Sequence, residues 1–242
     1  MVGAPGFFAP AVQAMDAEQK QEIELLIRDY LLKNPELMLE VQQALETKQK
    51  NVAAQKAKQA LATNKETIFN SIHQGTIGNV NGDVTVVEFF DYNCGFCQRA
   101  MGDMNVLLSN DSKLKFVMKE LPILSQGSVE ASRVSTAIYR LMPEKYGEFH
   151  NRLLSQEGQK DGNRARQIAK SMGLDVAAIE AEAAKDDLVG AFREVSDLAN
   201  DLGINGTPSY VIGDEIIFGA LGADVLREKI ENVRKCGHTV CS

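Results

Sequence analysis

Apolar residues recur at helical spacing along the first part of the chain and predict two consecutive helices. The first covers residues 16–33, and the second begins after Asn34 and runs over 35–72. Pro35 fits this boundary, because proline is tolerated in the first turn of a helix. From residue 46 to 65, lysine, glutamine and alanine dominate, so we expect that stretch to be helical and mostly solvated. The apolar side of the two helices comprises Ile23, Leu26, Ile27, Tyr30, Leu31, Met38, Val41 and Leu45.

Helices this long and thin cannot bury their own apolar side. The apolar residues must either fold back on the rest of the chain or meet the same residues of another copy. We predict self-association through residues 16–50. Heptads are not sustained over three or four repeats, so the pattern does not establish a simple long coiled coil.

Beyond residue 73, short apolar runs that are typical of strands alternate with helical segments, which indicates an α/β protein. The run 84–90 is almost continuously apolar, as in a strand covered on both faces. Residues 128–203 show helical spacing throughout, and their apolar positions predict four helices. A last helix is marked by Leu226, Ile230 and Val233. The remaining predicted strands are 76–79, 114–118, 209–212 and 215–218.

Two cysteines stand where the strand 84–90 gives way to a predicted helix at 98–109, in the order Cys94-Gly95-Phe96-Cys97. Unpaired N–H groups and the dipole at a helix N-terminus favour a thiolate at Cys94 and lower its pKa. Cys97 lies one helical turn further on, where it can resolve a mixed disulfide. The alternative is half of a zinc site, but zinc requires four ligands and this motif supplies two. The spacing therefore favours redox chemistry.

Two distant features fit this chemistry. Glu88 lies in the apolar strand before the cysteines, where a buried carboxylate can relay the proton of Cys97; the alternative is a solvent-facing strand residue. Thr207-Pro208 directly precedes the strand 209–212 and suits a cis peptide bond that turns towards the cysteines. The alternative is an ordinary trans proline at the start of a strand.

Composition narrows the classes of function. The chain has 242 residues and a formal net charge of −7, without a basic patch, which argues against a nucleic-acid partner. No apolar run reaches the roughly 18 residues of a membrane span. Residues 1–15 resemble the end of a signal peptide, although an apolar disordered tail fits equally well. The four cysteines suit an oxidising compartment.

The second pair of cysteines closes the chain, in Cys236-Gly237-His238-Thr239-Val240-Cys241. We predict a structural disulfide between Cys236 and Cys241 that ties down the C-terminal tail. A metal or copper site that includes His238, or two free thiols, are the alternatives. The sequence predicts no cofactor and no dedicated metal site.

Three motifs together resemble the DsbA-like branch of the thioredoxin superfamily: 86–97 with its two cysteines, Lys119-Glu120-Leu121-Pro122, and Gly206-Thr207-Pro208-Ser209. The resemblance covers roughly residues 75–235, and residues 27–36 resemble the N-terminal extension of ScsC proteins (suppressor of copper sensitivity). It implies an α/β thioredoxin-like fold. The catalytic domain would span 73–242 with a helical insertion at about 126–203, after an oligomerisation extension and linker at 16–72.

The resemblance also implies thiol-disulfide exchange in the periplasm, with Thr207, Pro208, Gly95 and Phe96 near the substrate. Strong oxidases of this family carry Pro-His between the cysteines, whereas Gly-Phe is closer to the Gly-Tyr of disulfide isomerases, which also have a threonine before the proline. Cys94 should therefore be less acidic than in a strong oxidase.

We predict an oligomeric isomerase or reductase, dimeric or trimeric, that acts on misfolded or reduced secreted proteins. A membrane thiol reductant of DsbD or ScsB type would keep it reduced. The alternatives are a monomeric DsbA-type oxidase, served by a membrane oxidase of DsbB type, and a copper-tolerance protein that holds Cu(I) between Cys94 and Cys97.

Overall fold

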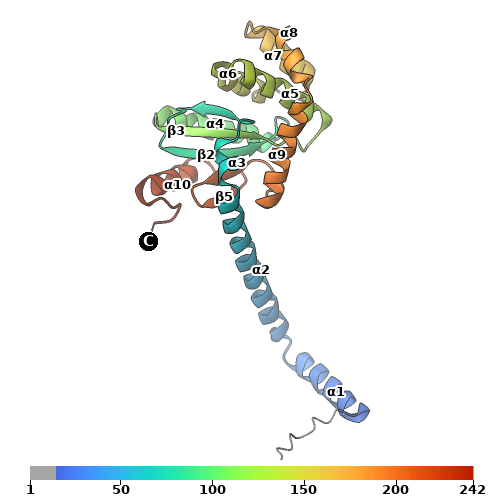
Figure 1. Ribbon diagram of the computed structural model, residues 1–242. Coiled ribbons are helices and arrows are strands. Elements are labelled where there is room, and N and C mark those ends of the chain that lie inside the picture. The colour runs from blue at the N-terminus through green and yellow to red at the C-terminus, as the bar shows by residue number, and fades with distance from the viewer. Residues whose placement is uncertain (1–14, 242) are drawn as a thin grey trace, which may run out of the picture. The chain divides into compact units, whose positions relative to one another are not determined.

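The computed structural model describes residues 15–241, so the predicted leader remnant lies outside the described residues except for Met15 (Figure 1). The chain divides into two compact units, and the division falls between Ala53 and Ala54, inside helix α2. Within residues 15–241, no helix has the length and apolar character needed to cross a bilayer.

The first unit consists of helix α1 (Ala17–Lys33) and most of helix α2 (Glu36–Thr63). A capping box starts α1, where the Gln19 N–H donates to Asp16 Oδ1 at 2.9 Å. Neither helix contains a buried residue, and Leu26 on the predicted apolar side is 69% exposed. Over residues 17–53 the apolar side of these helices therefore lacks the cover that stabilises helices in water, and only the end of α2, at Ala60 and Leu61, packs against a core.

The predicted helix over 35–72 is in fact two helices, because α2 ends at Thr63 and a short helix, α3 (Lys65–Asn70), follows. Asn64 makes the break: its backbone N–H and its side-chain Nδ2 both donate to the Ala60 carbonyl, at 2.9 and 3.0 Å. Beyond the break, Ile68 is completely buried in the second unit. Burial of Ile68 thus redirects a stretch that helix propensity alone would have continued.

A mixed five-stranded sheet in the order β1-β3-β2-β4-β5 forms the centre of the second unit. Strands β2 and β3 are parallel, whereas β1–β3, β2–β4 and β4–β5 are antiparallel pairs. The sheet confirms the predicted α/β, thioredoxin-like fold class. Its strands are β1 (Gly75–Gly78), β2 (Val84–Phe90), β3 (Leu114–Glu120), β4 (Ser209–Ile212) and β5 (Glu215–Phe218).

The sheet has a hydrophobic core on each face, because successive side chains of a strand point to opposite sides. Val86 in β2 belongs to the core shared with α4 (Gly95–Asn110) and α10 (Ala223–Cys236). Val87, its neighbour, belongs to the core on the other face, which contains residues of α3 and α9 (Asp187–Asp201). Burial on both faces explains the almost continuous apolar run of β2.

Four helices form a group beside the sheet (Figure 1): α5 (Gln126–Leu141), α6 (Pro143–Leu154), α7 (Gly162–Ser171) and α8 (Val176–Ala183). Together with α9 they make five helices between β3 and β4, one more than the spacing predicted. The unpredicted helix is α8, which has only eight residues and buries a single large apolar side chain, that of Ile179. A short alanine-rich stretch shows too little periodicity to be recognised.

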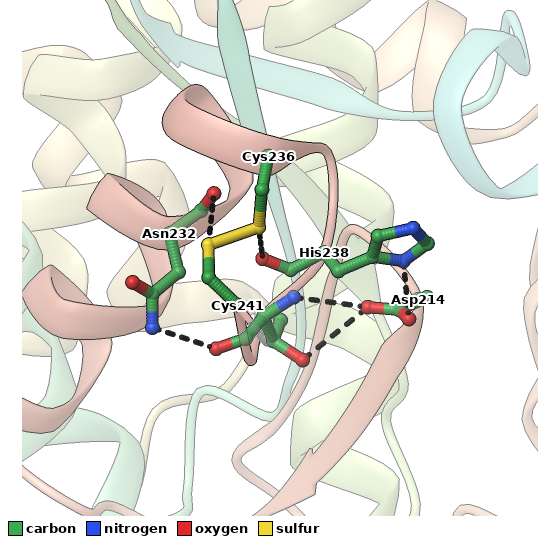
Figure 2. The surroundings of a disulfide bond; sticks show 6 residues. Asp214, Asn232, Cys236, His238 and Cys241 are labelled. Carbon is green, nitrogen blue, oxygen red and sulfur yellow. Dashed lines mark hydrogen bonds and ion pairs between the residues drawn. A yellow bond between two sulfur atoms is a disulfide. The ribbon is translucent and has the colours of Figure 1, made fainter.

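Cys236 and Cys241 form a disulfide directly after α10 (Figure 2). Helix α10 ends at Cys236 and is capped by Gly237, whose φ of 81° is a left-handed conformation that glycine adopts without strain. Asp214 holds the loop within the disulfide: its Oδ1 accepts the Thr239 N–H at 3.0 Å, and its Oδ2 lies 2.9 Å from His238 Nδ1. The disulfide thus closes a loop that packs on the turn between β4 and β5.

Replacement of both Cys236 and Cys241 by serine should lower the free energy of unfolding by about 2 kcal/mol, as expected for a cross-link that closes so short a loop. Urea unfolding of the double variant and of the native oxidised chain measures the difference. Exchange at Cys94 should be unchanged. Equal stability of the two proteins, or a loss of exchange, would show that this disulfide is not a structural one.

Candidate active site

The two cysteines of the CxxC motif lie at the junction of β2 and α4. Cys94 is the N-cap of α4, and its sulfur accepts the Cys97 N–H at 3.3 Å. Because a side chain caps the helix here, α4 begins at Gly95, earlier than the predicted start at residue 98. Both cysteines are free thiols in this structure.

The two sulfurs have opposite acidities. Hydrogen bonds from Cys97, from the Thr207 side chain and from the Cys97 and Phe96 N–H groups lower the pKa of Cys94 to about 5, although burial acts in the opposite direction. Burial raises the pKa of Cys97, which is completely covered, whereas Cys94 retains 6% exposure. At neutral pH, Cys94 is therefore a thiolate that a partner can reach, and Cys97 is a buried thiol.

The segment before β4 lies against Cys94. The peptide bond between Thr207 and Pro208 is cis, and the Thr207 carbonyl is 3.1 Å from Cys94 Sγ. The Pro208 carbonyl accepts the Gly219 N–H at 2.9 Å, which attaches this turn to the end of β5. Thr207, far from the cysteines in sequence, thus contacts the Cys94 sulfur.

Glu88 is 2% exposed, so it is not the solvent-facing strand residue of the alternative interpretation. It lies on β2 opposite Tyr210 of β4, and its position two residues from Val86 places it on the α4 and α10 face of the sheet. Burial raises the pKa of Glu88 to about 8, and the charges of Cys94 and Asp103 act in the same direction. With a pKa of about 8, the carboxyl group exchanges between its protonated and ionised forms near neutral pH, and the ionised form can accept and return a proton beside the dithiol.

Phe96 and Gly95 form the exposed side of the motif. The Phe96 ring is 57% exposed, and the Arg99 guanidinium lies 4.3 Å from the centre of the ring. No heavy atom lies within 4 Å of the position that a Gly95 Cβ would occupy. The surface beside Cys94 is therefore open and partly apolar.

Sequence analysis did not identify the polar residues that fix the turn before Cys94. Asp91 accepts the Asn93 N–H at 2.8 Å through Oδ1 and the Leu124 N–H at 3.0 Å through Oδ2. Asn93 in turn pairs with the backbone of Lys160, in the loop before α7. Only the polar side chains at 91 and 93 hinted at such a turn, and nothing in the sequence pointed to Lys160.

A second buried acid, Glu120, lies at the end of β3. Its Oε1 accepts the Ser135 hydroxyl at 2.6 Å, and the same hydroxyl is 2.6 Å from the Tyr92 hydroxyl. Burial raises the pKa of Glu120 to about 8. Neither cysteine is among the groups that act on this carboxyl, which instead joins β3 to α5.

Comparison with known proteins agrees with this geometry. Residues 85–231 match the DSBA-like thioredoxin domain, and residues 19–51 match the copper resistance protein ScsC N-terminal domain. Disulfide bond formation protein D of Bacillus subtilis is 23% identical over 175 residues, which cover 67% of this chain and 78% of that protein.

Solved structures show the same relationship. A thioredoxin-like oxidoreductase from Silicibacter pomeroyi is 35% identical, with a TM-score of 0.68, and the match covers 72% of this chain and 99% of that one. The thiol-disulfide exchange protein α-DsbA2 from Wolbachia pipientis is 32% identical, with a TM-score of 0.68 and coverage of 74% and 97%. Proteus mirabilis ScsC in a transitional conformation is 28% identical, with a TM-score of 0.66 and coverage of 90% and 98%.

The DSBA-like match spans more than half of the chain and includes the strand that carries Glu88, both cysteines and the Thr-Pro turn. The chain therefore belongs to the DsbA-like thioredoxin family of thiol-disulfide oxidoreductases.

Proposed function

We propose that the protein is an oligomeric disulfide isomerase or reductase of the periplasm and that it acts through Cys94 and Cys97. The observation that carries the proposal is the difference between the two sulfurs, one a thiolate that keeps a small exposed area and the other a completely covered thiol. This arrangement suits an enzyme that attacks a substrate disulfide through one sulfur and resolves the adduct through the other.

The exchange begins when the Cys94 thiolate attacks one sulfur of a substrate disulfide. The substrate S–S bond breaks, a mixed disulfide forms, and the other substrate sulfur leaves as a thiolate. In isomerisation, a different substrate thiolate then attacks the substrate sulfur of the mixed disulfide. A new substrate S–S bond forms, the bond to Cys94 breaks, and Cys94 leaves as a thiolate, with no net oxidation or reduction.

In reduction, the ionised form of Glu88 accepts the Cys97 proton, and the Cys97 thiolate attacks Cys94 Sγ. The second substrate thiolate is released, so the Cys94–Cys97 pair is oxidised by two electrons and the substrate disulfide is reduced. The Glu88 proton can then pass to the departing sulfur.

The substrate segment would lie across the cis-proline turn and the exposed Phe96 ring. Among residues 15–241, the Thr207 carbonyl accepts no main-chain hydrogen bond. Its contact is with the Cys94 sulfur. A carbonyl at that place can pair with the backbone of an extended substrate. Gly95 leaves room for the substrate next to the attacking sulfur.

The acidity of Cys94 supports a reduction potential between those of a strong oxidase and of thioredoxin. Its pKa of about 5 falls between the values of ~3.5 for the strongly oxidising DsbA and ~7 for the reducing thioredoxin. The Gly-Phe dipeptide lacks the imidazole that strong oxidases place between their cysteines. We therefore propose that a membrane thiol reductant of DsbD or ScsB type keeps the protein reduced.

Oligomerisation would arise from the first unit, with a second copy of the chain as the partner. Helices α1 and α2 contain no buried residue and carry exposed apolar side chains along their length. The match of residues 19–51 to the ScsC N-terminal domain covers this apolar side. Catalytic units held together by α1 and α2 can bind one misfolded secreted protein at several points.

Two findings support the periplasm. A disulfide such as that between Cys236 and Cys241 is typical of proteins in an oxidising compartment. A related solved structure, 25% identical, is a periplasmic thioredoxin-like protein from Salmonella enterica.

A ribonuclease assay tests the proposed activity. In a glutathione buffer, catalytic amounts of the protein should restore activity to scrambled ribonuclease, and Cys94→Ser should abolish the effect. Rapid oxidation of reduced ribonuclease, without recovery of the scrambled form, would instead identify a DsbA-type oxidase that works with a DsbB-type partner.

A further inference from the structure

The loop before α7 is fastened to the residue that precedes the reactive cysteine. Asn93 Oδ1 accepts the Lys160 N–H at 2.7 Å, and Asn93 Nδ2 donates to the Lys160 carbonyl at 2.8 Å. The same Nδ2 also donates to Ser128 Oγ at 2.9 Å, which adds the first turn of α5. A paired contact of this kind fixes both the position and the orientation of the Lys160 backbone.

The start of α5 is shaped to receive this loop. A Cβ on Gly127 would lie 3.3 Å from the Lys160 carbonyl, a tight contact, and 2.8 Å from Gln159 Nε2, the movable end of a side chain, so glycine favours the observed approach. Ser125 caps the helix by accepting the Ser128 N–H at 3.1 Å. Lys160 is therefore held beside the CxxC motif by Asn93, in the turn between β2 and α4, and lies close to the first turn of α5.

The side chain of Lys160 has no obvious structural purpose. The residue is only 5% exposed, yet among residues 15–241 its ammonium group has neither an ion pair nor a hydrogen bond. Burial lowers the pKa of Lys160, and the charge that acts in the opposite direction is that of Cys94. The ammonium nitrogen itself is not fully covered, so the side chain buries its stem while its charge stays partly solvated and within the influence of the Cys94 thiolate.

We propose that Lys160 stabilises the Cys94 thiolate by charge and that Asn93 is the positioning residue that holds Lys160 in place. This inference rests on the proposed role of Cys94 as the attacking thiolate. The helical insertion thereby supplies a cation that the Gly-Phe dipeptide does not. The thiolate exists only in the reduced form, so Lys160 favours reduction of the Cys94–Cys97 pair and makes the protein a stronger oxidant.

Lys160→Met removes the charge and retains most of the side chain. The ultraviolet absorbance of the thiolate, followed against pH, gives the Cys94 pKa, and equilibration with glutathione gives the redox constant. In Lys160→Met we expect the thiolate-to-thiol ratio of Cys94 to fall roughly tenfold, as the loss of a nearby charge in partly solvated surroundings predicts. The redox constant should move towards the oxidised protein.

Three further variants separate charge from packing. Lys160→Arg should retain the native pKa and redox constant, and Lys170→Met, which removes an exposed charge from α7, should leave both unchanged. Asn93→Ala should raise the pKa of Cys94, and this rise should not add to that of Lys160→Met. If Lys160→Met does not fold, Lys160→Gln and Asn93→Ala provide the same comparison.

An unchanged Cys94 pKa in the folded Lys160→Met variant would overturn the inference. Equal shifts in Lys160→Met and Lys160→Arg would do the same, because they would indicate a packing effect. These titrations do not depend on whether the protein is an isomerase or an oxidase. A failed ribonuclease assay therefore leaves this result standing, and the reverse is also true.

Discussion

A chain that begins at Ala54 should be monomeric and should lose most of its isomerase activity while its Cys94–Cys97 pair still exchanges with small disulfides. The division between the two compact units falls at this residue, and Leu61 and Ile68, which belong with the second unit, are retained. The loss should be roughly tenfold or more, because a substrate held at several points dissociates more slowly than one held at a single point.

Light scattering of the intact and shortened chains gives the molar mass, and scrambled ribonuclease gives the isomerase activity. A point variant tests the same surface in the full chain. Leu26→Lys places a charge on the apolar side of α1, whereas Gln21→Lys places the same side chain on the opposite side of the helix. Only the first should dissociate the oligomer. Identical mass and activity in the intact and shortened chains would contradict the proposal.

Glu88→Gln should slow the resolution of mixed disulfides by roughly a hundredfold, within the range that general-base catalysis contributes. Cys97 is a buried thiol with a raised pKa, so it requires a base before it can attack. Glutamine has nearly the same shape as glutamate but cannot accept the proton. Rapid-quench measurements of a preformed mixed disulfide between Cys94 and a peptide give the rate.

The same substitution should change the dependence of stability on pH. The pKa of Glu88 is about 8 in the folded protein, against 4.5 for an ordinary glutamate, so the folded state binds more protons between these values. Stability should therefore fall as the pH rises from 4.5 to 8. Each pKa unit corresponds to about 1.4 kcal/mol. At the upper end of this pH range, near pH 8, Glu88→Gln should therefore be more stable than the native chain by roughly 4 kcal/mol.

Glu120→Gln is the matched control. Glu120 is also buried with a pKa of about 8, but its contacts are with Ser135 rather than with the dithiol. It should share the gain in stability at alkaline pH and should leave the resolution rate unchanged. If both variants slow resolution equally, the effect comes from a buried acid in general and Glu88 is not the proton acceptor.

The fold class could be predicted because its signals are local. The strand over 84–90, the cysteine pair and the Thr-Pro turn each follow from a short stretch of sequence, and together they identified the family. The break at Asn64 could not be predicted, because it depends on Ile68 reaching a core built largely from β2, β3 and α9. Helix α8 was missed because its burial depends on a neighbouring helix rather than on its own periodicity.

The site was predictable only in part, for a related physical reason. Cys94 and Cys97 identify themselves by their spacing, and Glu88 stands out as a charge in an apolar strand. Nothing in the sequence distinguishes Lys160 from any other lysine in a polar loop. Its position depends on two hydrogen bonds with Asn93, which is 67 residues away along the chain. Contacts across such separations exist only in the folded protein.

The contact between Cys94 and Thr207 has a consequence during synthesis of the protein, because 113 residues separate the two. The growing chain presents its cysteines long before the residue that completes their surroundings has been synthesised. Until β4 is inserted beside β2, Cys94 lacks the Thr207 hydroxyl that helps to lower its pKa. In the nascent polypeptide, the Cys94 thiol is therefore less reactive. It becomes fully reactive only when the complete chain has folded.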